Sequence, residues 1–255
     1  MSQRFWPIAT GIALRQLGKF ARTANFIPPL LIPCLFLAAF AGGLSAVSTS
    51  AKFGYPNYTA FVWVFVLVMG AAFSGIFSSV AFTDDLEDGF IRRIMLNTPG
   101  RAPIIVGLVL ASFLQAIFIV LFLFGAGLIA GMEATGSAPQ LAAVLVLGLL
   151  LNVAVSLYGL GVALRVRSAL ASPLMLLPAF CVIFTAPVYV PRHLLSGWLH
   201  TVSDVNPLTP LLESSRGFLI GVPFHTALAF GTVLGMILLF YVFAWTGMQK
   251  LAREP

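Results

Sequence analysis

The residues best suited to chemistry lie together in one short charged segment. Positions 83–101 read TDDLEDGFIRRIMLNTPGR and contain four of the chain's eight acidic residues. We predict a helix over 84–98, because Thr83 can cap its N-terminus and the acidic residues favour the positive end of the helix dipole. The two arginines that follow approach the negative end. The pattern therefore predicts a well-specified short helix, even with Gly89 inside it.

One side of this predicted helix is apolar and the other is charged. Leu86, Phe90 and Ile94 share the apolar side. Asp88 and Arg92, at the i, i+4 spacing, can form an ion pair on the other side. An apolar ridge with charged flanks suits docking into a groove on another protein, and a loop that only reversed the chain would need neither feature.

Other residue types capable of chemistry form no complete site. His193, His200 and His225 are close in sequence, but no nearby cysteine or acidic ligand completes a metal site. No nucleophile is matched with a base, so we predict neither catalytic residues nor a bound metal. The phosphate loop G-x-x-x-x-G-K-[ST] does not occur in the sequence, so any ATP-binding site would belong to another polypeptide.

The elements that position these residues follow from the distribution of charge. Of the 255 residues, 60% are hydrophobic and only 9% are charged, which is too little polar surface for a water-soluble globule. Six uncharged runs are each about long enough to cross roughly 30 Å of hydrocarbon as a helix. We therefore predict an all-α, polytopic membrane protein formed by a single domain over 1–255. Its six transmembrane helices are expected at 26–47, 59–82, 103–132, 141–164, 172–190 and 227–248.

The basic residues predict the orientation of these spans. With both termini in the cytoplasm, only Lys52, Arg192 and Arg216 of the fourteen basic residues fall outside, as the positive-inside rule favours. The first segment, 1–25, has basic residues on one face and apolar residues on the opposite face, so we predict an interfacial amphipathic helix. The net charge of +6 is explained by topology and anionic lipid, and no long basic tract indicates nucleic-acid binding.

The segment 191–222, between the last two spans, is expected on the outer side. It is rich in apolar residues and contains Trp198 and an Asn206-Pro207 turn. We predict short re-entrant helices that fold back into the outer leaflet, where protein must cover their backbone. Glu213 and Arg216 are expected to form a local i, i+3 pair on the second of these helices.

Polar side chains inside the spans have two open interpretations. Gln115, Asn152, Ser156 and Tyr158 would be costly if they faced lipid, so they should face protein or a cavity. Hydrogen bonding between helices is one explanation, and contact with a substrate is the other. No acidic or basic residue lies near the centre of a span, which disfavours a proton- or ion-coupled carrier.

Two separated motifs resemble one family of membrane proteins. Asp88-Gly89, the apolar and basic helix after it, and the Leu-x-Thr-Pro-x-Arg sequence ending at Arg101 look like the cytoplasmic coupling segment of ABC-2 type permeases. The Asn206-Pro207 segment resembles the extracellular segment between spans five and six of that family, particularly of its daunorubicin-resistance-type drug exporters. The resemblance covers essentially the whole chain.

The resemblance implies a transporter subunit without a catalytic site of its own. Two copies of a separate cytoplasmic ATPase, which would bind ATP and Mg²⁺, would drive export of an amphiphilic drug, antibiotic or lipid-like compound. A second permease chain, identical or paralogous, would complete the dimer in the cell membrane. The residues implied in coupling to the ATPase are Asp88, Gly89, Phe90, Ile91, Arg92 and Ile94. The residues implied at the exit are Trp198, Asn206, Pro207, Glu213 and Arg216. The alternative function is an ion-coupled secondary transporter or a channel.

Overall fold

A computed structural model describes residues 5–22, 25–44, 53–97 and 101–251, although not the side chains of residues 92, 96 and 97. Its elements in chain order are α1 (Phe5–Arg22), α2 (Ile27–Gly43), α3 (Tyr58–Glu87), α4 (Phe90–Asn97), α5 (Ala102–Ile129), α6 (Ala138–Val166), α7 (Ala171–Phe184), the 3₁₀ turn η3 (Arg192–Leu194), α8 (Gly197–Val205), α9 (Thr209–Leu219) and α10 (Thr226–Leu251). The described residues form helices and connecting segments without strands, so the all-α prediction is confirmed.

Fewer helices reach membrane-spanning length than the six predicted. The helices α3, α5, α6 and α10 are each long and apolar enough to cross a bilayer. The bent pair α1 and α2, whose axes differ by 56°, could provide a fifth span. The apolar helix α7 ends at Phe184, short of the predicted boundary at Val190, because Pro187 follows closely and proline disfavours a continuing helix.

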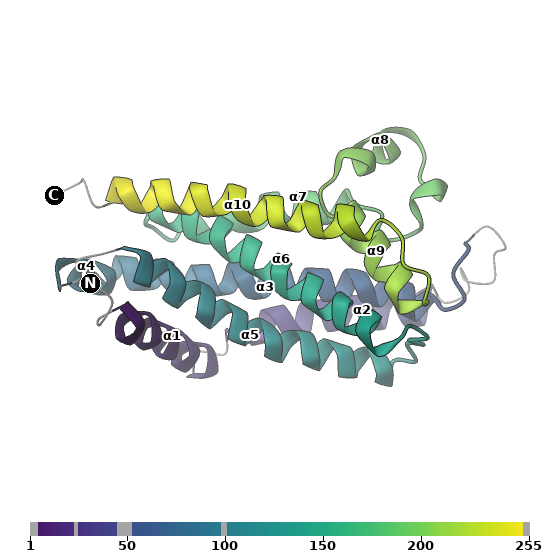
Figure 1. Cartoon of the computed structure of the whole chain (residues 1–255), viewed down its shortest axis with the longest axis horizontal. Coiled ribbons are helices and arrows are strands. Elements are labelled where there is room, and N and C mark those ends of the chain that lie inside the picture. Colours follow the sequence, from purple (N-terminus) through teal and green to yellow (C-terminus); the bar gives the residue numbers. More distant parts are fainter. Residues whose placement is uncertain (1–4, 23–24, 45–52, 98–100, 252–255) are drawn as a thin grey trace.

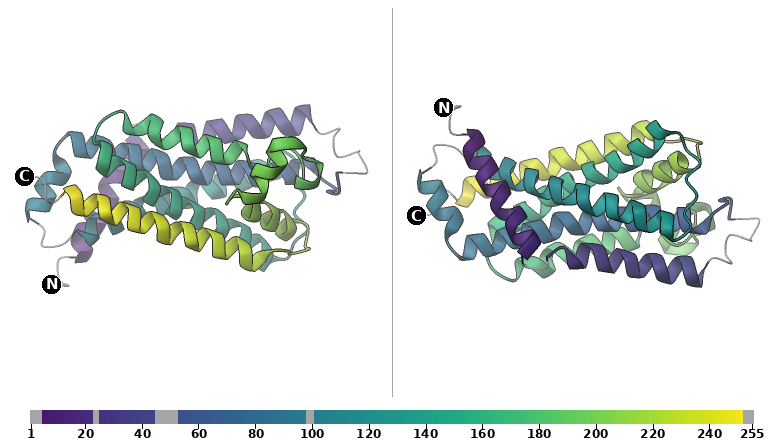
Figure 2. Two further views of the ribbon diagram at one scale, coloured as in Figure 1. Left: turned by 90° about the horizontal axis from the view of Figure 1, so that it is seen from above. Right: turned by 90° about the horizontal axis from the view of Figure 1, so that it is seen from below.

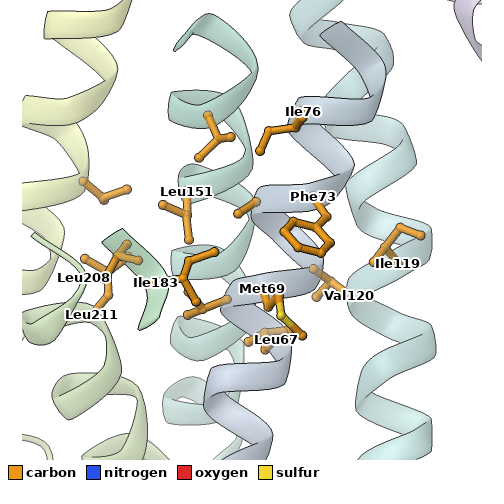
Figure 3. Close-up of a cluster of buried hydrophobic side chains, with 14 of the residues drawn as sticks. Leu67, Met69, Phe73, Ile76, Ile119, Val120, Leu151, Ile183, Leu208 and Leu211 are labelled. Atoms are coloured by element: carbon orange, nitrogen blue, oxygen red, sulfur yellow. The ribbon is translucent and has the colours of Figure 1, made fainter. Parts of the chain in front are cut away.

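Helix α3 occupies the centre of the bundle (Figure 1). It packs against α2, α5 and α6, and 94% of its most apolar stretch is buried. In Figure 3, Phe73 of α3 lies with Ile119 of α5 on one side and Leu151 of α6 on the other. A helix that is apolar on all faces belongs in such a central position, with protein rather than water around it.

Close helix crossings depend on glycines at particular contacts. A Cβ atom added to Gly75 of α3 would lie 2.9 Å from the backbone nitrogen of Ser156 in α6. One added to Gly107 of α5 would lie 2.6 Å from the carbonyl oxygen of Ala9 in α1. Small residues therefore permit these backbones to approach closely, as is common where helices pack within membranes.

The connecting elements separate into two groups at opposite ends of the bundle. Helices α1 and α4 lie near the end where α10 terminates, whereas α8 and α9 lie at the other end (Figures 1 and 2). Helix α1 crosses the bundle and packs on α5, burying Ala9, Ile12, Ala13 and Gln16. The amphipathic pattern of α1 thus covers another helix, while Trp6 and Leu14 stay exposed on its surface.

Candidate functional site

The structure divides the predicted helix 84–98 at Gly89. Residues Asp84 to Glu87 form the last turn of α3, and Gly89, with φ of 70°, separates α3 from α4. The expected N-terminal cap is therefore wrong: the hydroxyl of Thr83 donates a hydrogen bond within α3 to the carbonyl oxygen of Ser79, at 3.1 Å. The acidic run ends one helix instead of starting the next, and glycine permits the left-handed backbone between them.

Acidic residues at the C-terminal end of a helix oppose its dipole, and α1 supplies the compensating charge. The carboxylate of Asp85 is 1% exposed and accepts bonds from Arg15 Nη2 at 2.8 Å and Lys19 Nζ at 2.5 Å. Its other oxygen accepts a bond from Gln16 Nε2 at 2.8 Å. Three side chains from two consecutive turns of α1 therefore hold one buried carboxylate of α3.

Arg15 also connects this cluster to α4. Its guanidinium lies over the ring of Phe90, 4.0 Å from the ring centroid, while it binds Asp85. The hydrogen bond to Asp85 raises the pKa of Arg15, so the guanidinium stays charged throughout the physiological range. We call the group Arg15, Gln16, Lys19, Asp85 and Phe90 the α1–α3–α4 joint.

The residues implied in coupling to the ATPase belong to this joint or lie next to it. Ile91 is fully buried, and Phe90 and Ile94 are half-buried against the core. Asp88 is exposed, and its carbonyl oxygen accepts a bond from Arg93 Nη2 at 3.2 Å. The predicted ion pair between Asp88 and Arg92 stays a prediction, because the Arg92 side chain lies outside the described residues. The joint thus fixes one side of α4.

Four members of this joint, Arg15, Gln16, Lys19 and Asp85, could not be recognised from local sequence patterns. The sequence predicts Asp85 as an acid at the start of a helix, and α1 as an interfacial helix whose basic face lies opposite its apolar face. The partners are 70 and 66 residues from Asp85 in the chain, too far for any local spacing rule. The i, i+4 spacing of Arg15 and Lys19, together with a dense acidic run elsewhere, was the available signal.

At the opposite end, α9 enters the bundle and packs against α3, α6 and α10. Arg216 of α9 is only 2% exposed; it donates to the carbonyl oxygens of Phe61 at 3.2 Å and Pro187 at 2.8 Å. Its guanidinium stacks 3.5 Å from the centroid of the Phe61 ring. Burial lowers the pKa of Arg216 to about 10, which still leaves it charged at neutral pH.

The predicted pair between Glu213 and Arg216 is wrong. Glu213 instead binds Arg192, with 3.0 Å between its Oε1 and the Nε of that arginine. Arg216 is turned into the protein, where the carbonyl oxygens of α3 and of the segment before η3 receive its hydrogen bonds. Spacing along one helix could not reveal this, because both partners come from distant parts of the chain.

Asn206 and Pro207 form the expected turn between α8 and α9. The Asn206 side chain accepts a bond from the backbone nitrogen of Leu208 at 2.8 Å, and its Nδ2 donates to the carbonyl oxygen of Val182 at 2.7 Å. The asparagine therefore shapes the turn and fastens it to the end of α7. Trp198, on α8, is 71% exposed.

The polar residues inside the long helices fall into two groups. Asn152 is buried and links three helices, because its Nδ2 donates to Ala71 and its Oδ1 accepts from Ser112, both at 3.1 Å. Ser156 and Gln115 are also buried within the bundle. These side chains lie at helix contacts, where interhelical hydrogen bonding is common.

Tyr158 lies beside an apolar cavity. The cavity, of about 150 Å³, lies between α6, α7 and α10 and is also lined by Pro178, Met236 and Phe240. The tyrosine hydroxyl donates to the carbonyl oxygen of Leu174 at 2.8 Å, so it holds α7 against α6. Tyr158, one of the four predicted path residues, thus lines this cavity.

Comparison with known proteins agrees with this arrangement. A family model described as ABC-2 type transporter matches residues 11–220, from α1 through α9. A search of curated proteins found no match to the chain. The match includes both the joint around Asp85 and the segment around Arg216. The helical membrane architecture and a match over most of its length show that the chain belongs to the ABC-2 type transporter family.

Proposed function

We propose that this chain is the permease subunit of an ATP-binding cassette exporter that moves an amphiphilic drug, antibiotic or lipid-like compound out of the cytoplasm or inner leaflet. The observation that carries the proposal is the family match over residues 11–220. The family's membrane domains work with a nucleotide-hydrolysing partner, and the chain's own sequence lacks the phosphate loop that such a partner needs.

The bundle end that carries α1 and α4 is the cytoplasmic end in this proposal. The described basic residues at that end include Arg15, Lys19, Arg101, Arg165 and Arg167, whereas the α8–α9 end carries Arg192 and Arg216. This asymmetry agrees with the positive-inside rule for the cell membrane. In this proposal, α1 and the last turn of α10 both lie on the cytoplasmic side of the membrane.

Six crossings are part of the same proposal. Helix α2 has 17 residues and α7 has 14, which correspond to about 26 Å and about 21 Å at 1.5 Å per residue. Both run along the bundle beside the four longer helices (Figure 2). The segment after Phe184, against which α9 packs through Arg216, would complete the membrane crossing that α7 begins.

Two cytoplasmic ATP-binding subunits, each holding ATP and Mg²⁺, dock against α4 of two permease chains in this proposal. The half-buried Phe90 and Ile94 and the exposed Asp88 present mixed apolar and charged surface for such a contact. A displacement of α4 by the ATP-binding subunit would be transmitted to α3 through Phe90, Arg15 and Asp85, because Arg15 contacts both helices.

The proposed exit lies at the α8–α9 end, around Trp198, Asn206, Pro207, Glu213 and Arg216. Support for an amphiphilic cargo comes from the apolar cavity beside Tyr158, whose single hydroxyl is already bonded to α7. A cavity lined in this way suits hydrocarbon or aromatic groups better than ions. An ion-coupled carrier or channel is the second candidate function.

The energy source distinguishes the two functions. Inside-out vesicles from cells that contain the chain and its native partner subunits are incubated with a panel of fluorescent amphiphiles in the external medium. We expect ATP to drive uptake after ionophores have collapsed the ion gradients. Uptake driven by an imposed ion gradient without ATP would contradict the proposal and favour the second candidate.

A further inference from the structure

A second cavity lies beside Arg216 at the α8–α9 end of the bundle. Its volume is about 260 Å³, and the lining includes Tyr55, Arg192, His193, Glu213, Arg216 and His225. These residues come from the segment before α3, from η3, from α9 and from the residue that precedes α10. The volume is several times the roughly 30 Å³ occupied by one water molecule in the liquid. The space can therefore accommodate a small group with polar atoms.

The guanidinium of Arg216 has bonding capacity that the protein leaves unused. Its Nε and Nη1 donate to carbonyl oxygens, whereas Nη2 is buried and has no hydrogen-bond partner among the described residues. An unpaired buried donor on a charged group is costly, and such groups are usually satisfied by a partner. The fork of an arginine is well suited to the paired oxygens of a carboxylate or phosphate.

Among the described residues, no carboxylate forms an ion pair with Arg216. Glu213 is bound to Arg192 at 3.0 Å, and Arg192 also lies 3.4 Å from Asp204. In the part of the chain that the structure describes, the hydrogen bonds of Arg216 go to neutral carbonyl groups. A buried cation whose hydrogen-bond partners are neutral favours an anion in the adjoining space.

We propose that this cavity binds an anionic oxygen group, a carboxylate or a phosphate, with Arg216 and Arg192 as its cationic ligands. The group would be either a free oxyanion or the headgroup of an amphiphile. The site does not depend on the proposed exporter function, because binding is a property of this chain alone. Glu213 sets the affinity by competing for Arg192.

Calorimetric titration of the purified full-length chain in neutral detergent at low ionic strength tests the site. The probes are inorganic phosphate, dihexanoyl phosphatidic acid and the uncharged dihexanoylglycerol. Binding of phosphate and of the phosphatidic acid would show that the oxyanion suffices. Binding of the phosphatidic acid alone would identify an amphiphile headgroup. If neither anion binds, or if dihexanoylglycerol binds equally well, the proposal is overturned.

Two substitutions with opposite expected effects on anion binding distinguish a change at the site from a loss of folding. Arg192→Gln should weaken anion binding roughly three- to tenfold, as expected for loss of one partly exposed charge. Glu213→Gln should tighten binding by a similar factor, a change that unfolding cannot produce. Lys250→Gln, at the far end of α10, serves as the matched control and should bind like the unmodified chain. Equal affinity in all three variants would overturn the assignment of the site.

Discussion

At the scale of single residues, Asp85 is a buried carboxylate that three side chains bind. A carboxylate buried without partners costs several kcal/mol, and the cost is offset only when hydrogen bonds and opposite charges surround it. Asp85 has bonds from Arg15, Gln16 and Lys19, all from α1. Its function in the fold is therefore to attach α1 to the end of α3, next to the start of α4.

Removing this charge should loosen the joint. We expect Asp85→Asn to destabilise the chain by about 2 kcal/mol, because Arg15 and Lys19 lose their shared anionic partner. The measurement is the apparent Tm in detergent, which should fall by several degrees. Asp84→Asn, at the exposed neighbouring position, is the control and should leave Tm nearly unchanged. Equal Tm values for the two variants would show that the Asp85 cluster does not hold α1 in place.

Residue-level predictions succeeded where the partner was local and failed where it was distant. The Asn206-Pro207 turn was identified correctly, because an asparagine side chain shapes its own turn within two residues. The predicted ion pair between Glu213 and Arg216 was wrong, since Arg216 instead donates a hydrogen bond to the carbonyl oxygen of Phe61, which is 155 residues away. Spacing rules contain no information on such partners.

At the scale of elements, α4 is a short helix fixed on one side and exposed on the other. Ile91 is buried in the core, whereas Phe90 and Ile94 are only half-buried. Gly89 separates α4 from α3 with a left-handed backbone, so the two helices are distinct elements. Such an element can contact a partner without unfolding the long helix beside it.

An acidic substitution on α4 should prevent ATP-driven transport, because the ATP-binding partner can no longer dock there. We expect Phe90→Asp to reduce ATP-driven uptake at least tenfold while the chain remains inserted, because the apolar docking surface and the contact with Arg15 are lost together. Uptake by inside-out vesicles is the measurement, and membrane abundance is determined in parallel. Phe90→Leu keeps an apolar side chain and should retain most of the activity. Unimpaired uptake by Phe90→Asp would exclude a coupling role for α4.

The crossing of α3 and α6 should be sensitive to a single methyl group. We expect Gly75→Ala to cost about 1–3 kcal/mol, because its Cβ would press on the backbone of Ser156 and Asn152 and the helices would have to separate. Apparent Tm in detergent is again the measurement. Gly231→Ala in α10 is the matched control, as among the described residues nothing lies within 4 Å of the added carbon. If both variants have the same Tm, the close approach at Gly75 is not required.

Much of the fold could be predicted at this scale, but some helix boundaries could not. Uncharged runs locate α3, α5, α6 and α10, because hydrocarbon forces the backbone to form its own hydrogen bonds. The start of the predicted helix 84–98 was wrong because α3 continues through its charged end, where α1 supplies the opposite charge. Composition alone could not distinguish a helix that begins with acids from one that ends with them.

At the scale of the whole molecule, the chain has two different ends joined by apolar helices. One end contains the ion-paired joint of α1, α3 and α4, and the other contains the buried Arg216 beside a polar cavity. Helix α3 runs from one to the other, with Phe61 contacting Arg216 and Asp85 contacting α1. A movement imposed at one end therefore has a rigid, central path to the opposite end.

The arrangement of the ends across the membrane can be measured directly. In a variant with Cys34 and Cys181 replaced by alanine, we expect a cysteine at Ser196 to react with an impermeant maleimide in intact cells. A cysteine at Arg167 should react only after the cells are permeabilised, because α7 lies between these positions. Equal labelling of both positions in intact cells would show that α7 does not cross the membrane.

The central claim is that this permease works through a separate ATPase that docks on α4, and copurification tests it most directly. The chain is tagged, extracted in mild detergent from cells containing its native partners, and assayed for a bound nucleotide-binding subunit and ATPase activity. We predict that both copurify with the unmodified chain and with Phe90→Leu, and that both are lost with Phe90→Asp. Absence of any ATPase from the folded, unmodified chain, or equal recovery with Phe90→Asp, would contradict the account.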